Sequence, residues 1–156
     1  MKNWMKISFW LAVFVSARGY AQQQEPVLTA YLALKDALVA SDAAAAASNA
    51  GELVKQLSVI PTANQRKEVS TLIGKVKADA EKIAASKALP AQREAFTPLS
   101  ANFFTLAKEM PLSTLPLYQF YCPMKKAVWL SAEKAVKNPY YGNQMLTCGS
   151  LQDTLN

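Results

Sequence analysis

Apolar residues recur every three or four positions over four segments of this chain, with polar residues between them. In chain order, the segments run from Val27 to Leu38, from Leu53 to Leu57, from Val69 to Ile83 and from Phe96 to Met110. This spacing places the apolar residues of each segment on one face of an α-helix. The pattern therefore predicts four amphipathic helices.

Local signals mark the ends of these helices. Asp42 precedes an alanine-rich run and is expected to cap the second helix. The sequence IPTANQ at 60–65 predicts a loop, because its proline cannot donate a helical hydrogen bond. QQQEP at 22–26 is expected to be a polar lead before the first helix. Pro98 is expected to disturb a fourth helix that begins near Pro90.

The helical period stops at Pro111, and the remaining residues have a different composition. LYQFYC at 117–122 and AVWLS at 127–131 are aromatic and β-branched, which favours a small two-stranded hairpin. LQDTLN at 151–156 is expected to form a final short helix. The expected fold class is all-α: an up-down bundle of about four helices with an irregular C-terminal segment that can include a short β-hairpin.

The N-terminal residues 1–21 are predicted to be a secretory signal peptide, which leaves residues 22–156 as a single domain. A short basic start, MKNWMK, is followed by an apolar run of 11 residues and by small residues before a cleavage position after Ala21. This run is too short for a membrane span, which needs about 20 residues. We therefore expect a periplasmic or secreted protein with no stable membrane span after the signal is removed.

Charge and composition exclude several classes of function. Removal of Lys2, Lys6 and Arg18 with the signal lowers the formal net charge from +6 to +3. No run of Lys or Arg exceeds two residues, so a nucleic-acid partner is not expected. The chain has no histidine, which removes the commonest general base and the commonest zinc ligand. No glycine-rich loop precedes a helix, and we do not expect an enzyme.

Sulfur side chains supply the remaining candidate chemistry. Cys122 and Met124 are two residues apart, and Met145 and Cys148 are three apart. Thiolate and thioether are soft donors that suit Cu(I), so these residues are candidate metal ligands. However, two cysteines in an exported protein most often form a disulfide, and the methionines would then be packing residues. The residues alone leave both possibilities open.

A small-molecule pocket between the helices is a third possibility. The aromatic residues that would line it are Phe103, Phe104, Phe120 and Trp129. In the C-terminal segment, Gly142 and Gly149 are expected to supply positive-φ turns.

Three short sequences near the C-terminus form one motif: YCPM, WLS and NPYYGNQMLTCG, in that order. This motif resembles the signature of the domain of unknown function 3347 family, and YLALKDALVASDAAAAASNAGEL is similar to its first two helices. The resemblance extends from Val27 to the end of the chain. The family comprises small exported bacterial domains. It is also similar to a domain attached to periplasmic adaptor subunits of copper/silver-type heavy-metal efflux pumps.

The resemblance implies a role in periplasmic metal handling. By position in the motif, the metal ligands would be Cys122, Met124, Met145 and Cys148, with Cu(I) as the ion. The frame around them would be Trp129, Asn138, Tyr140, Tyr141 and Gly142. Only KKAV separates Met124 from Trp129, which is shorter than is usual in the family and predicts a tight hairpin with two lysines near the sulfurs.

Two functional hypotheses follow for the exported protein. The first is a copper-binding or copper-handling protein associated with heavy-metal efflux, with a metal ion and a periplasmic efflux adaptor protein as partners. The alternative is a structural or protein-interaction helical bundle, stapled by a Cys122–Cys148 disulfide and without metal.

Overall fold

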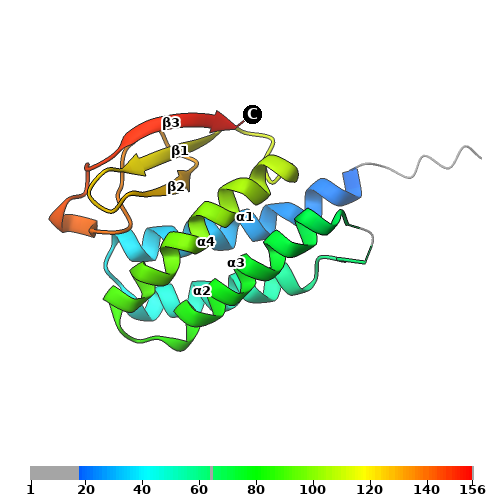
Figure 1. The fold of residues 1–156 in the computed structure, drawn as a ribbon, viewed down its shortest axis with the longest axis horizontal. Helices are drawn as coiled ribbons and strands as arrows, with labels where there is room; N and C mark the ends of the chain where they lie inside the picture. The colour runs from blue at the N-terminus through cyan, green and yellow to red at the C-terminus, as the bar shows by residue number, and fades with distance from the viewer. Residues whose placement is uncertain (1–17, 64, 156) are drawn as a thin grey trace, which may run out of the picture.

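The computed structural model describes residues 18–63 and 65–155, with side chains described from residue 25 onward within those ranges (Figure 1). Four helices are followed by a small sheet that packs against one side of them. The signal peptide predicted for residues 1–21 lies almost entirely outside the described residues.

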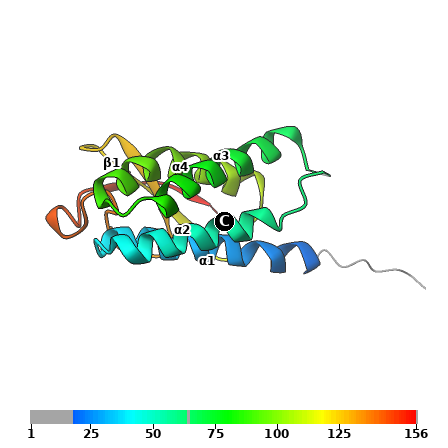
Figure 2. The same ribbon diagram turned by 90° about the horizontal axis from the view of Figure 1, so that it is seen from below.

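The helices alternate in direction along the chain, as predicted for an up-down bundle (Figures 1 and 2). Their bounds are α1 Arg18–Val39, α2 Ala43–Ser58, α3 Lys67–Ala85 and α4 Leu89–Glu109. Each helix packs against the next one in the chain. Short connections between antiparallel neighbours produce this arrangement.

Two of the predicted helix boundaries are confirmed. Asp42 caps α2, because its carboxylate accepts a hydrogen bond from the N–H of Ala45 at 2.9 Å. The described residues of this segment, 60–63 and 65, lie between α2 and α3 and belong to neither helix. Local capping and proline chemistry therefore decide where these helices end.

The predictions made around two prolines need correction. The polar lead predicted at 22–26 is instead part of α1, which begins at Arg18 and contains Pro26. Glutamine is a good helix former, so a glutamine run favours continuation of the helix. The fourth helix begins at Leu89, close to the predicted Pro90, and runs to Glu109 with the exposed Pro98 inside it.

Buried side chains from all four helices form the core. The apolar stripe predicted for α3 is confirmed by its buried residues, which include Val69, Ile73, Val76, Ala80 and Ile83. α1 and α4 meet through aromatic rings: the centroid of Tyr31 lies 4.0 Å from that of Phe103 and 5.7 Å from that of Phe96.

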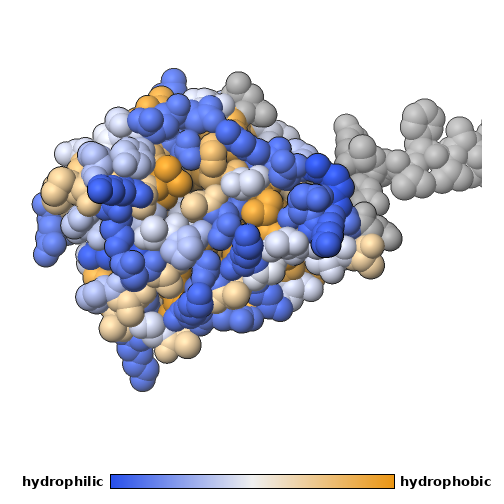
Figure 3. Space-filling model, in the orientation of Figure 1, coloured by the Kyte–Doolittle hydropathy of each residue, from blue (hydrophilic) through white to orange (hydrophobic). Residues whose placement is uncertain are grey.

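The opposite faces of the helices carry polar residues. The surface in Figure 3 is accordingly a mixture in which hydrophilic residues predominate. None of the helices in the described part of the chain combines the length and apolar character that a membrane span requires.

The C-terminal part forms a three-stranded antiparallel sheet, so the all-α prediction is wrong for this region. Its strands are β1 Leu117–Cys122, β2 Ala127–Ser131 and β3 Ser150–Leu155, in the order β2-β1-β3, and a 3₁₀ turn η1, Gly142–Gln144, precedes β3. The predicted β1–β2 hairpin is confirmed, whereas the predicted helix at 151–156 is a strand. β3 pairs with β1 along the edge that faces away from β2, and this pairing satisfies the backbone hydrogen-bonding groups of that edge.

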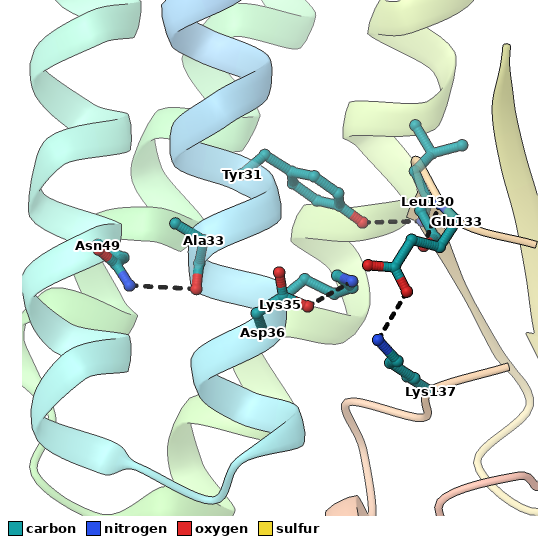
Figure 4. A network of polar contacts seen from close by, with 9 residues as sticks. Tyr31, Ala33, Lys35, Asp36, Asn49, Leu130, Glu133 and Lys137 are labelled. Carbon is teal, nitrogen blue, oxygen red and sulfur yellow. Dashed lines mark hydrogen bonds and ion pairs between the residues drawn. The ribbon is translucent and has the colours of Figure 1, made fainter. Parts of the chain in front are cut away.

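Two tyrosine hydroxyls close the outer edge of β2. The N–H of Leu130 donates to the hydroxyl of Tyr31 at 3.0 Å (Figure 4), and the hydroxyl of Tyr140 donates to the carbonyl of Val128 at 2.5 Å. The Tyr31 hydroxyl also lies 2.6 Å from Ser100 Oγ on α4. Burial raises the pKa of both phenols, so both remain neutral at physiological pH. The edge is thereby protected from pairing with another chain.

Charged residues compensate one another beside this edge. Lys35 is buried, with 3% of its side chain exposed, and its Nζ lies 2.6 Å from Asp36 (Figure 4). After β2, Lys137 pairs with Glu133 at 2.6 Å. Lys137, through its hydrogen bond and its charge, lowers the pKa of Glu133, and the charge of Lys35 adds a smaller contribution. The buried ammonium group therefore lies among opposite charges, which offsets the cost of its burial.

We predict that Tyr31→Phe lowers the free energy of unfolding by about 1–3 kcal/mol, because the buried N–H of Leu130 loses its acceptor. Urea denaturation of residues 22–156, followed by circular dichroism, measures the change. Tyr118→Phe, at a half-buried position of β1, is the matched control and should change the free energy by less than about 0.5 kcal/mol. Equal losses in the two variants would contradict the role given to Tyr31.

Candidate functional site

The structure brings the two cysteine side chains into contact. Cys122 Sγ lies 3.8 Å from Cys148 Sγ, although the residues are 26 positions apart in the chain. Both are free thiols. Cys122 is fully buried, with 0% exposure, and Cys148 is half-buried. Solvent therefore reaches the pair from the side of Cys148.

A tight turn places Cys122 and its surroundings. Cys122 ends β1 and is paired with Ala127 of β2, so residues 123–126 form the hairpin turn that the short spacing predicts. The N–H of Lys125 donates to Cys122 Sγ at 3.4 Å. The ammonium group of Lys125 binds Glu94 of α4 at 2.5 Å. One of the two lysine charges expected near the sulfurs is therefore balanced by a carboxylate.

Asn138, which is 0% exposed, positions the loop that carries Cys148. Its Nδ2 donates to the carbonyl of Cys148 at 2.7 Å, and its backbone N–H donates to the carbonyl of Leu146 at 2.8 Å. Its Oδ1 accepts from the N–H of Tyr140 at 2.8 Å, and its carbonyl accepts from the N–H of Gly142 at 3.0 Å. One buried residue thus holds both ends of the loop.

Arg93 of α4 fastens the same loop to the helices. Its guanidinium group donates to the carbonyls of Leu38 and Pro139 and to Ser41 Oγ, at 2.9 Å in each case. Gly142 lies beside it with a φ of +56°, and a Cβ at this glycine would lie 2.7 Å from Arg93 Nη2. The predicted positive φ of Gly142 is confirmed, and the close contact is a second reason for glycine here.

Gly149 is required by a close contact, and its predicted positive φ is wrong. A Cβ at Gly149 would lie 2.5 Å from Cη2 of Trp129. Trp129 is buried and held between other rings, with its centroid 5.3 Å from Phe120 and 6.2 Å from Tyr140. The residue next to Cys148 therefore rests directly on a buried indole.

The two methionines of the predicted site lie near the cysteines in the chain but differ in exposure. Met124 belongs to the hairpin turn and is 63% exposed. Met145 is half-buried, and its carbonyl accepts the N–H of Cys148 at 3.0 Å. Within the described part of the chain, no group of three or more His, Cys, Asp or Glu side chains could hold a metal ion. Any protein ligands beyond the two thiols would thus have to come from the thioethers or from the backbone.

The environment of Cys148 favours its neutral thiol. Burial raises the pKa of Cys148, and Cys122 raises it further as a hydrogen-bond partner and as a neighbouring charge. Two thiolates in contact would repel each other. A bound cation would remove this repulsion, whereas without one Cys148 retains its proton at neutral pH.

The four aromatic residues predicted to line a pocket pack in different surroundings. Phe103, Phe120 and Trp129 are core residues with 0–1% exposure. Phe104 is half-buried, with the ammonium group of Lys108 4.3 Å above its ring. Three of the four rings therefore fill the core.

Two residues near the site, Arg93 and Glu94, were not predicted from the sequence. Both lie on α4, where a polar side chain between apolar positions normally faces solvent. No local signal distinguishes Arg93 from other surface cations, because its three acceptors come from segments distant in the chain.

The fold and the site define a small helical protein with a pair of thiols at one end of an attached sheet. The chain matches the family described as "Protein of unknown function (DUF3347)" over residues 27–114. This range is more than half of the chain, and the chain belongs to this family. No curated protein and no solved structure matches it.

The family match covers α1 from Val27 onward and all of α2, α3 and α4, and it ends before β1. It begins at Val27, as the resemblance predicts, and family membership is confirmed. The Cys/Met motif, however, lies outside the matched range. The case for a sulfur site in this chain therefore depends on the geometry of its own C-terminal segment.

We predict that Gly149→Ala lowers the free energy of unfolding by about 1–3 kcal/mol, because the new methyl group would overlap the ring of Trp129. Gly74→Ala is the control, since a Cβ at this position in α3 has no neighbouring atom within 4 Å. It should raise the free energy of unfolding by about 0.5–1 kcal/mol. Urea denaturation measures both, and a neutral or stabilising effect of Gly149→Ala would contradict the packing described.

Proposed function

We propose that this chain is an exported protein that binds a soft metal ion, Cu(I) above all, through the thiolates of Cys122 and Cys148. Met145 and Met124 serve as additional sulfur ligands. The protein sequesters the ion or transfers it to a periplasmic heavy-metal efflux system.

The separation of the two thiols is the observation that carries this proposal. Two sulfurs that bind one ion at about 2.3 Å each, with the angle of a tetrahedral site, lie about 3.8 Å apart. The sulfurs of Cys122 and Cys148 are 3.8 Å apart. Two thiolate ligands can therefore bind without rearrangement of the backbone.

The donor set and its surroundings favour a soft cation. The chain has no histidine, and thiolate and thioether bind Cu(I) in preference to oxygen-seeking ions such as Ca²⁺ and Mg²⁺. The N–H of Lys125 donates to Cys122 Sγ, and Glu94 offsets the charge of the Lys125 side chain. The positive charge near the site is thus lower than the sequence indicates.

The methionines complete the ligand set. Met145 is three residues from Cys148 and shares a turn with it. Met124 lies on the hairpin turn that follows Cys122, its backbone is near Cys148, and its exposed, flexible thioether can adapt to a bound ion. The association with efflux depends on the family resemblance, and export depends on the predicted signal peptide.

We predict that the reduced mature protein binds one Cu(I) per chain in competition with a chromophoric chelator. Cys122→Ser or Cys148→Ser should weaken binding about 100-fold or more, and Met145→Leu about tenfold, because each removes a sulfur ligand. Met110→Leu is the matched control, since Met110 is buried at the end of α4 and the exchange preserves volume. Unchanged affinity in the double variant Cys122→Ser/Met145→Leu would overturn the site.

A structural role for the cysteines is the alternative that the same geometry supports. A disulfide requires the sulfurs to approach from 3.8 Å to about 2.05 Å. Closing a loop of this length would stabilise the fold by about 3–4 kcal/mol in the chain-entropy model. The protein would then be a stapled helical bundle that binds other proteins and no metal.

The mass of the mature protein distinguishes these functions. If the metal-binding form predominates, protein purified from the periplasm with thiols blocked at lysis should carry two blocking groups per chain. A mass lower than that of the reduced chain by two hydrogens, together with no Cu(I) binding after reduction, would favour the stapled bundle.

A further inference from the structure

We propose that the cysteine pair exchanges with external low-molecular-weight disulfides in a fixed order. Cys148 attacks first, Cys122 resolves the mixed intermediate, and the resulting protein disulfide closes the metal site. The exchange can be measured without metal, whereas the closing of a metal site rests on the proposed function.

The difference in burial between the two thiols sets the order. Cys122 has 0% exposure, lies at the inner end of β1 and has its sulfur beneath the turn at 123–126. Cys148 is half-buried on the loop that leads into β3. An incoming disulfide must align with the attacking sulfur, and access limits this step. Cys148 is the more exposed of the two residues, so an incoming disulfide approaches its sulfur more readily than that of Cys122.

The reaction proceeds in two balanced steps. Cys148 loses its proton to solvent, and its thiolate then attacks one sulfur of the external disulfide, which forms a mixed disulfide and releases the first external thiolate. Cys122 then loses its proton to solvent and attacks the sulfur of Cys148, which releases the second external thiolate. Both leaving thiolates take up protons. The protein dithiol loses two electrons and the external disulfide gains them.

The geometry favours the second step. The sulfur of Cys122 is already 3.8 Å from that of Cys148, so the attack requires no movement of β1. The N–H of Lys125 donates to Cys122 Sγ and holds this sulfur in place beside Cys148. Formation of the bond requires an approach of the sulfurs to about 2.05 Å, and the loop of Cys148 supplies this movement.

The dithiol and disulfide forms have opposite metal-binding properties. Metal ligation requires thiolate sulfur, and a disulfide has no thiolate to offer. Oxidation of the pair therefore releases a bound soft ion, and reduction restores the site. Movement of Cys148 also moves Gly149, where an added Cβ would lie 2.5 Å from Cη2 of Trp129. After removal of residues 1–21, Trp129 is the only tryptophan, so its fluorescence follows the closing of the disulfide.

Oxidised glutathione is the probe that tests the order. In Cys122→Ser, the remaining Cys148 should form a stable mixed disulfide, detected by intact mass. In Cys148→Ser, the buried Cys122 should react more slowly by about tenfold or more, and at a comparable rate once urea unfolds the chain. Equal rates in the two folded variants would overturn the order.

The wild-type protein provides a test that does not depend on folding of the variants. A limiting amount of iodoacetamide should modify Cys148 before Cys122. Cleavage after Lys and Arg separates the two cysteines, because Lys125 and Lys137 lie between them. Earlier modification of Cys122 would overturn the proposal.

A final comparison separates this inference from the proposed function. Oxidised wild-type protein should not bind Cu(I), and reduction should restore binding. If the exchange follows the stated order but the reduced protein does not bind Cu(I), the proposed function fails and the exchange stands. If the reduced protein binds Cu(I) and the oxidised protein binds it equally well, the closing of the site is refuted.

Discussion

The buried side chain and backbone of Asn138 form the constraint on which the C-terminal half of this protein depends. Four hydrogen bonds, two from the side chain and two from the backbone, join it to Tyr140, Gly142, Leu146 and Cys148. A buried polar group is costly unless its partners are in place, so this network favours a single loop conformation. That conformation holds Cys148 against Cys122.

Hydrogen bonds from the helices also hold this loop and the sheet beside it. Arg93 joins the α1–α2 connection to Pro139, and Tyr31 joins α1 to the edge of β2. Both contacts cross from the helical bundle to the sheet and its loop, so the position of the sulfurs depends on all parts of the fold. A pair of thiols held in contact, with one side open to solvent, can bind a soft ion or close as a disulfide. The structure thus explains why the sequence alone does not decide between a metal site and a disulfide.

The helices were predictable because each has a local signature. The α3 stripe and the Asp42 cap are read within a few residues of sequence, and the structure confirms both. β3 was mistaken for a helix because its six residues gain their stability from pairing with β1, far away in the chain. The candidate sulfur residues followed from composition, since a chain without histidine has few other soft ligands. The contact of Cys122 with Cys148 fits this choice, whereas the roles of Arg93 and Gly149 depend on packing between distant segments.

We propose that two thiolates of one chain hold a soft ion, and X-ray absorption spectroscopy of reduced residues 22–156 with one equivalent of Cu(I) tests this proposal most directly. The account predicts a first shell of sulfur, with at least two scatterers at about 2.3 Å, the length of a metal–thiolate bond. The first shell should change in Cys148→Ser. A first shell of oxygen and nitrogen alone, or the same spectrum in Cys148→Ser, would contradict the claim.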